Sequence, residues 1–291
     1  MVKGIRLITL KTPSIFPTFT VANSKVVCYN TFCDCAATVF LFQEDPDMPR
    51  FFVTPETLAG TTAVLEGEQA AHAKVLRLGR GDQVTLCDGQ GTDAQCTIDD
   101  YGAGRVCLTI DRLEPSRSEP KLRCSVYMGF PKADKFEHVI QKATELGAFE
   151  IIVFPCSRSI SRPDAKSLTK KLERWQKIAV SAAEQSGRGL IPRVLALGSY
   201  EEAVKRACQC DLAAFFYENE RTCSLRSAVE AHAFTTAAIM TGPEGGLTDQ
   251  EVRLAQEAGM TVCSLGPRIL RCETAPLCAL SALMYAADEL A

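Results

Sequence analysis

Histidine and tryptophan are scarce in this chain, whose 291 residues include three His and one Trp. Cysteine is frequent, with 14 residues, but no two of them have the C-x-x-C spacing of zinc sites. The sequence therefore argues against a metal centre. Because the cysteines are scattered, and many stand alone within apolar stretches, we expect no disulfide framework and a protein that works in a reducing cytosol.

Long apolar segments and the glycine patterns of common nucleotide sites are also missing. Hydrophobic residues make up 46% of the chain, which is enough for a sizeable core. No run of them is long enough to span a membrane. Neither G-x-G-x-x-G nor G-x-x-x-x-G-K-[ST] follows an apolar strand. We therefore expect neither a membrane protein nor a Rossmann or Walker site.

Charge is nearly balanced overall but unevenly distributed along the chain. The net charge of −3 does not indicate a nucleic-acid-binding protein. Between residues 158 and 193, however, nine Lys and Arg stand against three Asp and Glu. Such a segment is either a solvated helix face or a surface that contacts the phosphates of RNA.

The first 47 residues differ from the rest of the chain. Prolines and polar residues interrupt this stretch, which has no sustained periodicity and lacks the form of a signal peptide. Met48 then opens "MPRFFVTPETL", which has the form of a natural beginning. We predict that residues 1–47 are an extension, arising from a misassigned start codon or forming a poorly ordered tail.

Residues 48–118 have the pattern of a small β-domain. A short helix is expected within residues 66–82, ended by glycines. Strands rich in Val, Ile, Thr and Cys are expected at 82–89, 93–102 and 104–115, with turn residues between them. This spacing predicts a small β-barrel.

Residues 119–291 alternate between apolar strands and amphipathic helices. Asp134 with Glu137, and Thr248 with Glu251, have the spacing of capping boxes. Strands that are apolar throughout and alternate with helices predict a parallel sheet covered on both faces. The expected strands are 122–130, 150–156, 211–218, 235–242 and 261–266, and the expected helices are 134–147, 166–188, 247–259 and 276–290.

Two of the predicted strands lead into loops that contain Gly-Pro. One loop begins at Thr241 in "TGPEGGL", and the other at Leu265 in "LGPRILRCETAPL". Ligands of open α/β sheets bind at the carboxyl ends of the strands. Glycine allows close backbone approach and proline fixes the loop shape. The loops are either tight turns or two walls of a ligand site, and the charged run Arg268 to Thr274 favours the second interpretation.

Several stretches resemble one family. They are "MPRFFV", "HAKVLRLGRGDQV", "QKATELG", "KKLERWQKIAVSAAEQSGR", "TGPEGGLTDQEV" and "LGPRILRCETAPL". These motifs, in this order over residues 48–291, are similar to the RsmE family, the 16S ribosomal RNA uracil N3-methyltransferases of the SPOUT class. The family's usual "LRTET" is "LRCET" here, with Cys272 in place of Thr.

The resemblance implies an α/β fold with two domains. Residues 48–118 would be a PUA-like β-barrel that binds RNA, and residues 119–291 a SPOUT methyltransferase domain whose parallel sheet contains a trefoil knot. It further implies S-adenosylmethionine as methyl donor, 16S rRNA or the small ribosomal subunit as substrate, a cytoplasmic homodimer with active sites at the subunit interface, and no metal.

The resemblance also places the cofactor between the two Gly-Pro loops. For transfer to N3 of uracil, which must lose a proton, we expect Glu273 to accept that proton, directly or through water, and Arg271 to stabilise negative charge on the uracil oxygens. Alternatively, Glu273 only pairs with Arg271 and holds the loop. The expected cofactor-binding residues are Thr241, Gly242, Pro243, Glu244, Gly245, Gly246, Leu265, Gly266, Pro267, Ile269, Leu270, Thr274 and Ala275.

Basic residues of the 158–193 segment are expected to contact RNA. Glu184 and Gln185 are further candidates for positioning it. Two other functions stay open: a non-catalytic RNA-binding protein, or another SPOUT reaction such as ribose 2′-O-methylation. The sequence does not identify the nucleotide, or whether free RNA or an assembled subunit is the substrate. The expected RNA-binding residues are Arg158, Arg162, Lys170, Lys171, Arg174 and Arg188.

Overall fold

The computed structural model describes residues 48–290 except 103, 161, 162 and 232, together with the backbone of three short segments nearer the N-terminus. The chain divides into two compact units, Met1–Met48 and Pro49–Ala291. In the first unit three strands form an antiparallel sheet that the sequence did not predict. They are β1 (Thr18–Ala22), β2 (Lys25–Tyr29) and β3 (Ala37–Val39).

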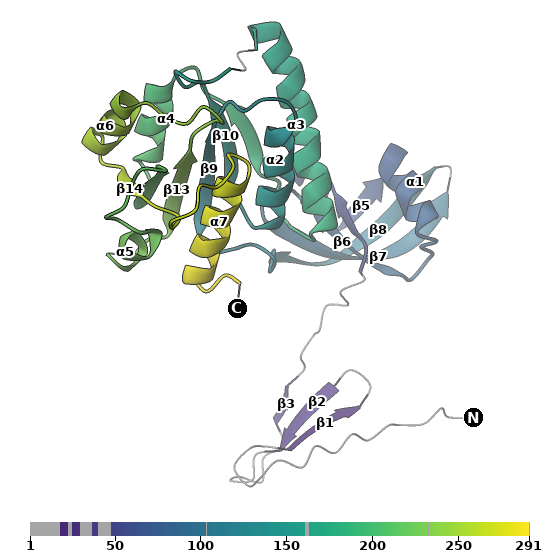
Figure 1. Ribbon diagram of the computed structural model, residues 1–291. Helices are drawn as coiled ribbons and strands as arrows, with labels where there is room; N and C mark the ends of the chain where they lie inside the picture. Colours follow the sequence, from purple (N-terminus) through teal and green to yellow (C-terminus); the bar gives the residue numbers. More distant parts are fainter. Residues whose placement is uncertain are drawn as a thin grey trace. The chain divides into compact units, whose positions relative to one another are not determined.

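The second unit begins with a five-stranded sheet of order β4-β6-β7-β8-β5 (Figure 1). Its apolar side chains, among them Val84, Ile98 and Leu108, form one buried cluster with residues of α1. Register shifts in the β7–β8 pairing increase the local twist of the sheet. The elements are β4 (Arg50–Phe52), η1 (Pro55–Leu58), β5 (Thr62–Leu65), α1 (Gly67–Val75), β6 (Gln83–Cys87), β7 (Thr92–Gly102) and β8 (Arg105–Pro115).

A six-stranded sheet of order β11-β10-β9-β13-β12-β14 comes next, and all its strand pairs are parallel, as predicted. The strands are β9 (Arg123–Gly129), β10 (Glu150–Phe154), β11 (Arg193–Ala196), β12 (Leu212–Phe216), β13 (Thr236–Thr241) and β14 (Thr261–Cys263). The helices are α2 (Lys135–Glu145), α3 (Ala165–Gln185), α4 (Tyr200–Ala207), α5 (Leu225–Glu230), α6 (Asp249–Glu257) and α7 (Thr274–Ala286).

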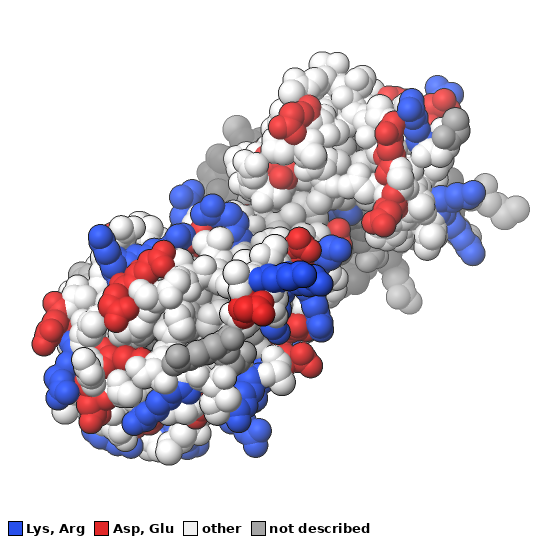
Figure 2. All heavy atoms as spheres, turned by 90° about the horizontal axis from the view of Figure 1, so that it is seen from above, with Lys and Arg blue, Asp and Glu red and all other residues white. Residues whose placement is uncertain are grey.

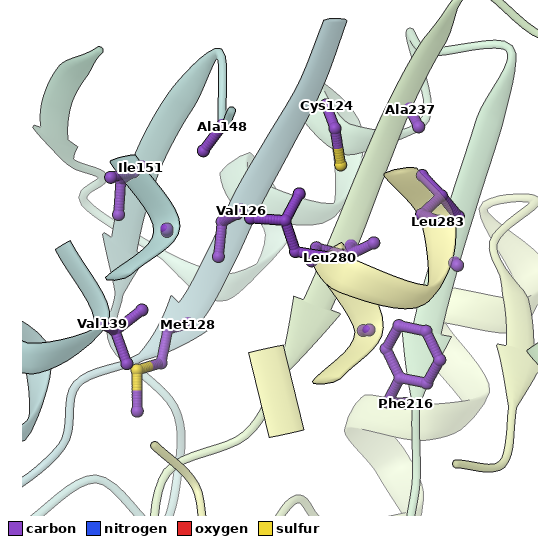
Figure 3. Close-up of a cluster of buried hydrophobic side chains, with 14 of the residues drawn as sticks. Cys124, Val126, Met128, Val139, Ala148, Ile151, Phe216, Ala237, Leu280 and Leu283 are labelled. Carbon is purple, nitrogen blue, oxygen red and sulfur yellow. The ribbon is translucent and has the colours of Figure 1, made fainter. Parts of the chain in front are cut away.

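Helices cover both faces of this parallel sheet. Residues of α2, α3, α5 and α7 pack with one set of strand side chains, and residues of α4 and α6 pack with the other. Along β9, Val126 faces the first cluster and the next residue, Tyr127, faces the second. Figure 3 shows the first cluster, in which Leu280 and Leu283 of α7 lie with Val126. Every β9 residue from Cys124 onward is buried, which explains why the strand is almost entirely apolar, with Ser125 as its one buried polar side chain.

One of the two predicted capping boxes is wrong. Asp134 precedes α2 but caps no backbone amide. Glu137 instead forms an ion pair with Arg174 of α3, with a nitrogen–oxygen distance of 2.7 Å. The box of Thr248 and Glu251 is confirmed at the start of α6. The short elements β11, α4 and α5 were not predicted, because each offers too few residues for a periodic pattern.

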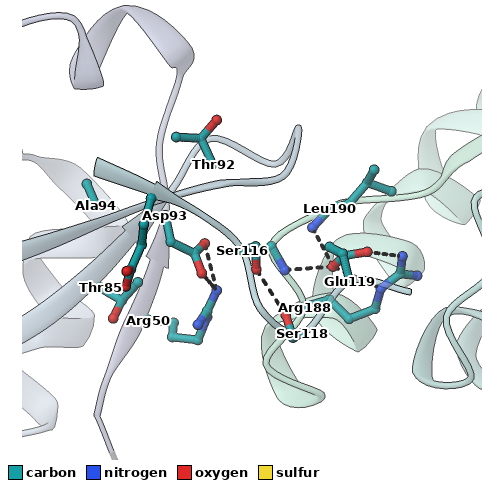
Figure 4. A network of polar contacts seen from close by, with 12 residues as sticks. Arg50, Thr85, Thr92, Asp93, Ala94, Ser116, Ser118, Glu119, Arg188 and Leu190 are labelled. Atoms are coloured by element: carbon teal, nitrogen blue, oxygen red, sulfur yellow. Dashed lines mark hydrogen bonds and ion pairs between the residues drawn. The ribbon is translucent and has the colours of Figure 1, made fainter. Parts of the chain in front are cut away.

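A polar junction joins the five-stranded sheet to the parallel-sheet domain (Figure 4). Glu119, in the linker between β8 and β9, pairs with the guanidinium of Arg188 at 2.6 Å. The same carboxylate accepts the backbone amides of Gly189 and Leu190, each at 2.9 Å. From the side of the five-stranded sheet, the amide of Gly91 donates to the carbonyl of Gly189. Polar groups on both sides of the junction therefore have hydrogen-bond partners.

Candidate functional site

A cavity of about 500 Å³ opens where three neighbouring strands of the parallel sheet end. Its walls come from Phe216 to Glu218 after β12, Thr241 to Gly246 after β13, and Ser264 to Cys272 after β14. This is the edge at which ligands of α/β sheets bind. The volume lies within the range of small-molecule sites, so the cavity is a candidate site for an organic ligand.

The two Gly-Pro loops supply most of the cavity wall, as the sequence predicted. Of the thirteen residues expected to bind a cofactor, twelve line the cavity. The exception is Thr274, which begins α7 and is exposed. Arg271 also lines the cavity, whereas Glu273 lies at its rim and contacts the lining residues Cys272 and Lys135.

Two glycines give these loops a backbone shape that other residues rarely adopt. Gly246 has φ +67° and Gly266 has φ +97°. A Cβ at Gly246 would also lie 2.8 Å from Oε1 of Glu218, on the neighbouring wall. The loops can therefore present peptide groups directly to a ligand in the cavity.

Residues after β12 line the cavity although the sequence patterns did not point to them. Phe216, Tyr217, Glu218 and Arg221 belong to this group. They reach the cavity because β12 lies between β13 and β14 in the sheet and ends at the same edge. That strand order is not visible in the sequence, where β12 precedes both Gly-Pro loops.

A lysine that sequence reasoning missed joins two walls of the cavity. The ammonium of Lys135 lies 3.0 Å from Oε1 of Glu244 and 3.2 Å from Oε2 of Glu273. The thiol of Cys272 donates to Oε2 of Glu273 at 3.2 Å, so it fulfils a donor role open to the Thr of the family motif. Of the alternative in which Glu273 only pairs with Arg271 and holds the loop, the partner is wrong, since the ionic partner of Glu273 is Lys135.

Neighbouring charges and hydrogen bonds determine the protonation states of Lys135, Glu244 and Glu273. Burial acts to raise the pKa of Glu273, but its own backbone amide, Cys272 and Lys135 outweigh burial and lower it. Burial also acts to raise the pKa of Glu244. Hydrogen bonds from its own backbone, Lys135 and Lys132 outweigh burial, so the pKa is lowered. Hydrogen bonds to Glu244 and then Glu273 raise the pKa of Lys135. At neutral pH both carboxylates are ionised and the amine is protonated.

Burial and its hydrogen bond to Glu273 raise the pKa of Cys272 to about 12. The thiol therefore stays protonated at neutral pH and is a donor rather than a nucleophile. Within the described part of the chain, no group of three or more His, Cys, Asp or Glu could hold a metal ion. No helix described here is both long and apolar enough to cross a bilayer.

The structure corrects one expected RNA contact. Arg188 is buried, with 4% of its side chain exposed, and pairs with Glu119. It also donates to the carbonyls of Thr144 and Ala148. The prediction that it contacts RNA is therefore wrong, since its guanidinium is buried and engaged with Glu119 and these two carbonyls. A guanidinium so enclosed cannot reach a phosphate.

The other expected RNA contacts lie in different surroundings. Arg158 donates to the carbonyls of Gly245 and Leu247 and so braces the first Gly-Pro loop. Lys170 is exposed on α3, and the ammonium of Lys171 lies over the ring of Trp175. Arg174 pairs with Glu137, Glu184 and Gln185 are both exposed, and Arg162 lies outside the described residues. Figure 2 shows basic and acidic side chains interspersed on one face.

Comparison with known proteins gives a consistent result. Residues 118–284 match a family model described as an RNA methyltransferase domain, and residues 65–111 match an RNA methyltransferase PUA domain. The curated ribosomal RNA small subunit methyltransferase E of Bacillus subtilis is 40% identical over 254 residues, or 84% of this chain and 98% of that protein. Its counterpart in Synechocystis is 33% identical over 80% of this chain and 76% of that protein.

A solved structure shares both the fold and much of the sequence. The ribosomal RNA small subunit methyltransferase E of Neisseria gonorrhoeae, bound to S-adenosyl methionine, has a TM-score of 0.71 and 34% identity to this chain. The match covers 82% of this chain and 97% of that structure.

Proposed function

The chain belongs to the family of ribosomal RNA small subunit methyltransferase E, and from this premise we propose that it methylates N3 of a uridine in 16S ribosomal RNA, with S-adenosylmethionine as methyl donor. The observation that supports this most directly is the cavity walled by two Gly-Pro loops at the carboxyl ends of β13 and β14. The Neisseria gonorrhoeae relative, of similar fold, is bound to that donor.

The residues of the cavity fit the proposed donor. Positive-φ glycines expose peptide groups for hydrogen bonds, and the volume of about 500 Å³ suits a ligand of this size. The ionised carboxylate of Glu244, in the cavity wall, complements a cation. When bound there, S-adenosylmethionine would supply an activated methyl group on positively charged sulfur.

Two side chains at the cavity have the properties that the reaction requires. The ionised carboxylate of Glu273 can accept the N3 proton, directly or through water, because its low pKa keeps it in the accepting form. Arg271 lines the cavity and is exposed, so its guanidinium can stabilise negative charge on the uracil oxygens. The bond from N3 to the methyl carbon forms as the carbon–sulfur bond breaks.

We further propose that the protein is a homodimer. Apolar side chains are exposed on α7, where Tyr285 is 75% exposed and Cys278 is exposed. Ile269, 81% exposed, belongs to the cavity wall itself. A second subunit covering this surface would complete the site from outside. The family also implies a trefoil knot and a cytoplasmic location near its ribosomal substrate.

The RNA would be contacted by the PUA domain and by the exposed basic side of α3. Lys170 and Lys171 lie on this helix, and Arg174 is largely exposed despite its pairing. Such contacts fix the position of RNA without reading its sequence.

Mass spectrometry of digested 16S rRNA tests the function. After incubation with the protein and S-adenosylmethionine, RNA or subunits lacking the modification should gain 3-methyluridine. A methyl group on a ribose would replace the proposal with 2′-O-methylation. RNA binding with no methyl incorporation in either substrate would identify a non-catalytic RNA-binding protein.

A further inference from the structure

Lys135 stands where a lysine is electrostatically unfavourable for its own helix. It is the first residue of α2, and the N-terminus of a helix carries partial positive charge. Two carboxylates from outside the helix offset this, namely Glu244 at 3.0 Å and Glu273 at 3.2 Å. They come from segments that follow different strands, β13 and β14. The ammonium is therefore the point at which two walls of the cavity and α2 meet.

The backbone before Lys135 is shaped to bring it there. Ala133 has φ +52°, a left-handed conformation that costs free energy for any residue other than glycine. The turn it makes also directs the amide of Lys132 to both oxygens of Glu244, at 3.1 and 3.3 Å. Strain of this kind persists where the surrounding contacts enforce it, and here those contacts converge on the cavity.

Glu273 has no second cation in this arrangement of described contacts. Its carboxylate meets Lys135 and the thiol of Cys272, while Lys135 itself faces Glu244, Glu273 and Cys272. Arg268, Arg271, Glu218 and Arg221 line the same cavity. A carboxylate that accepts a proton must be held in a fixed orientation toward the proton donor. The ammonium of Lys135 holds the carboxylate of Glu273 in this way.

We propose that Lys135 is a positioning residue for the methyl transfer, whose ammonium bridges Glu244 and Glu273, links the two Gly-Pro walls and holds Glu273 in its ionised, proton-accepting orientation. The proposal rests on the function proposed above and assigns a role to a residue outside both Gly-Pro loops. Lys135 acts through Glu273, so its removal should alter the pH dependence of the reaction as well as its rate.

The test compares Lys135→Met with Lys142→Met as a matched control. Lys142 lies on the same helix and pairs with Glu145 at 2.7 Å, away from the cavity lining. Single-turnover methylation at saturating S-adenosylmethionine is measured between about pH 4.5 and 9, and donor affinity is measured by calorimetry. Wild-type protein is measured first, and a wild type that transfers no methyl group would refute the proposed function rather than the role of Lys135.

With an active wild type, Lys135→Met should lower the single-turnover rate by about 10-fold or more. The acid limb of its pH–rate profile should move to higher pH by roughly one unit, because loss of a nearby cation raises the pKa of a carboxylate. Lys142→Met should match wild type. In a Glu273→Gln background, Lys135→Met should have little further effect, because both changes remove one coupled function.

Three results would overturn the proposal. One is a normal rate with an unshifted acid limb, and another is a lower rate with an unshifted limb, which would mean a merely structural role. The third is full additivity with Glu273→Gln. If Lys135→Met fails to fold, Lys135→Arg decides the matter: it keeps the cation and should keep the acid limb in place, and a shift in that variant contradicts the proposal.

Discussion

At the scale of single residues, the cavity rim is a small network of charges with defined partners. Glu273 combines a half-buried side chain, a lowered pKa and one ammonium partner. Cys272 adds a donor that stays protonated at neutral pH. These features suit a carboxylate that accepts a proton briefly and returns it to water, rather than one that stores a proton.

Glu273→Gln is expected to reduce the single-turnover methylation rate by ~100-fold, because an amide keeps the shape of the side chain but accepts no proton. Affinity for S-adenosylmethionine should change little, since Glu273 lies outside the cavity lining. Rapid-quench measurement of methyl incorporation, alongside calorimetry, checks both statements. Unchanged single-turnover rates would remove Glu273 from the mechanism.

A second carboxylate, Asp211, predicts a pH dependence of stability. Hydrogen bonds from the backbone amides of Thr235 and Thr236, and then from their hydroxyls, lower its pKa to about 2 from the ordinary value of 3.8. A depressed folded-state pKa adds stability that is complete above the unfolded pKa and is lost as pH falls through the folded value. Asp211→Asn should thus lower the urea midpoint at pH 7, and the difference from wild type should shrink below about pH 4. A difference that stays constant in acid would contradict this.

At the scale of elements, the strand ends and their loops carry the site, and helices bring the remaining partners. The C-terminal ends of β12, β13 and β14 build the walls, and the first residue of α2 ties two of them together. The junction at residues 188–190 plays the corresponding part between the two domains of the second unit.

Gly189→Ala tests how closely that junction is packed. A Cβ at Gly189 would lie 2.2 Å from Oγ of Ser116, which must then move. We expect a loss of about 1–3 kcal/mol in the free energy of unfolding, measured by urea denaturation. Gly198→Ala is the control, because its Cβ would meet only the end of Glu202, at 3.4 Å. Equal stability of the two variants would show that the junction is loosely packed.

Sequence patterns predicted the parts of the site that lie along one stretch of chain. The Gly-Pro loops follow apolar strands and could be placed at the ligand edge before any coordinates were known. Lys135 and Glu218 could not, because the order β13-β12-β14 and the turn at Ala133 bring them to the cavity from distant positions. Arg188 was wrongly expected at the surface, since charge composition does not reveal that Glu119 lies opposite it.

At the scale of the whole molecule, the similarity to known methyltransferases confirms the family that the motifs resembled, and it also confirms an α/β domain with a PUA domain before it. The main question about assembly is then whether a second subunit covers the exposed side of α7. Tyr285 is exposed on this helix, and Ile269 of the cavity wall is exposed as well.

Tyr285→Arg should convert the proposed dimer into monomers and lower methylation, because it places a charge on the exposed side of α7 that the second subunit would cover. Size-exclusion chromatography with light scattering measures the mass, and the 31.7 kDa chain makes the two states easy to separate. Val75→Arg, on an equally exposed apolar side chain of α1, serves as the control. A wild-type protein that elutes as a monomer at all concentrations would exclude the dimer.

The scarcity of tryptophan has a practical consequence once its position is known. Trp175 is the sole indole of the chain, and its ring meets that of Phe136 edge-on, with centroids 4.8 Å apart, between α3 and α2. Intrinsic fluorescence is thus an optical reporter of one helix pair, while the PUA domain contains no indole to emit beside it. Because α2 begins at Lys135, a change in emission on adding S-adenosylmethionine would indicate a change in the packing of α2 and α3 around Trp175.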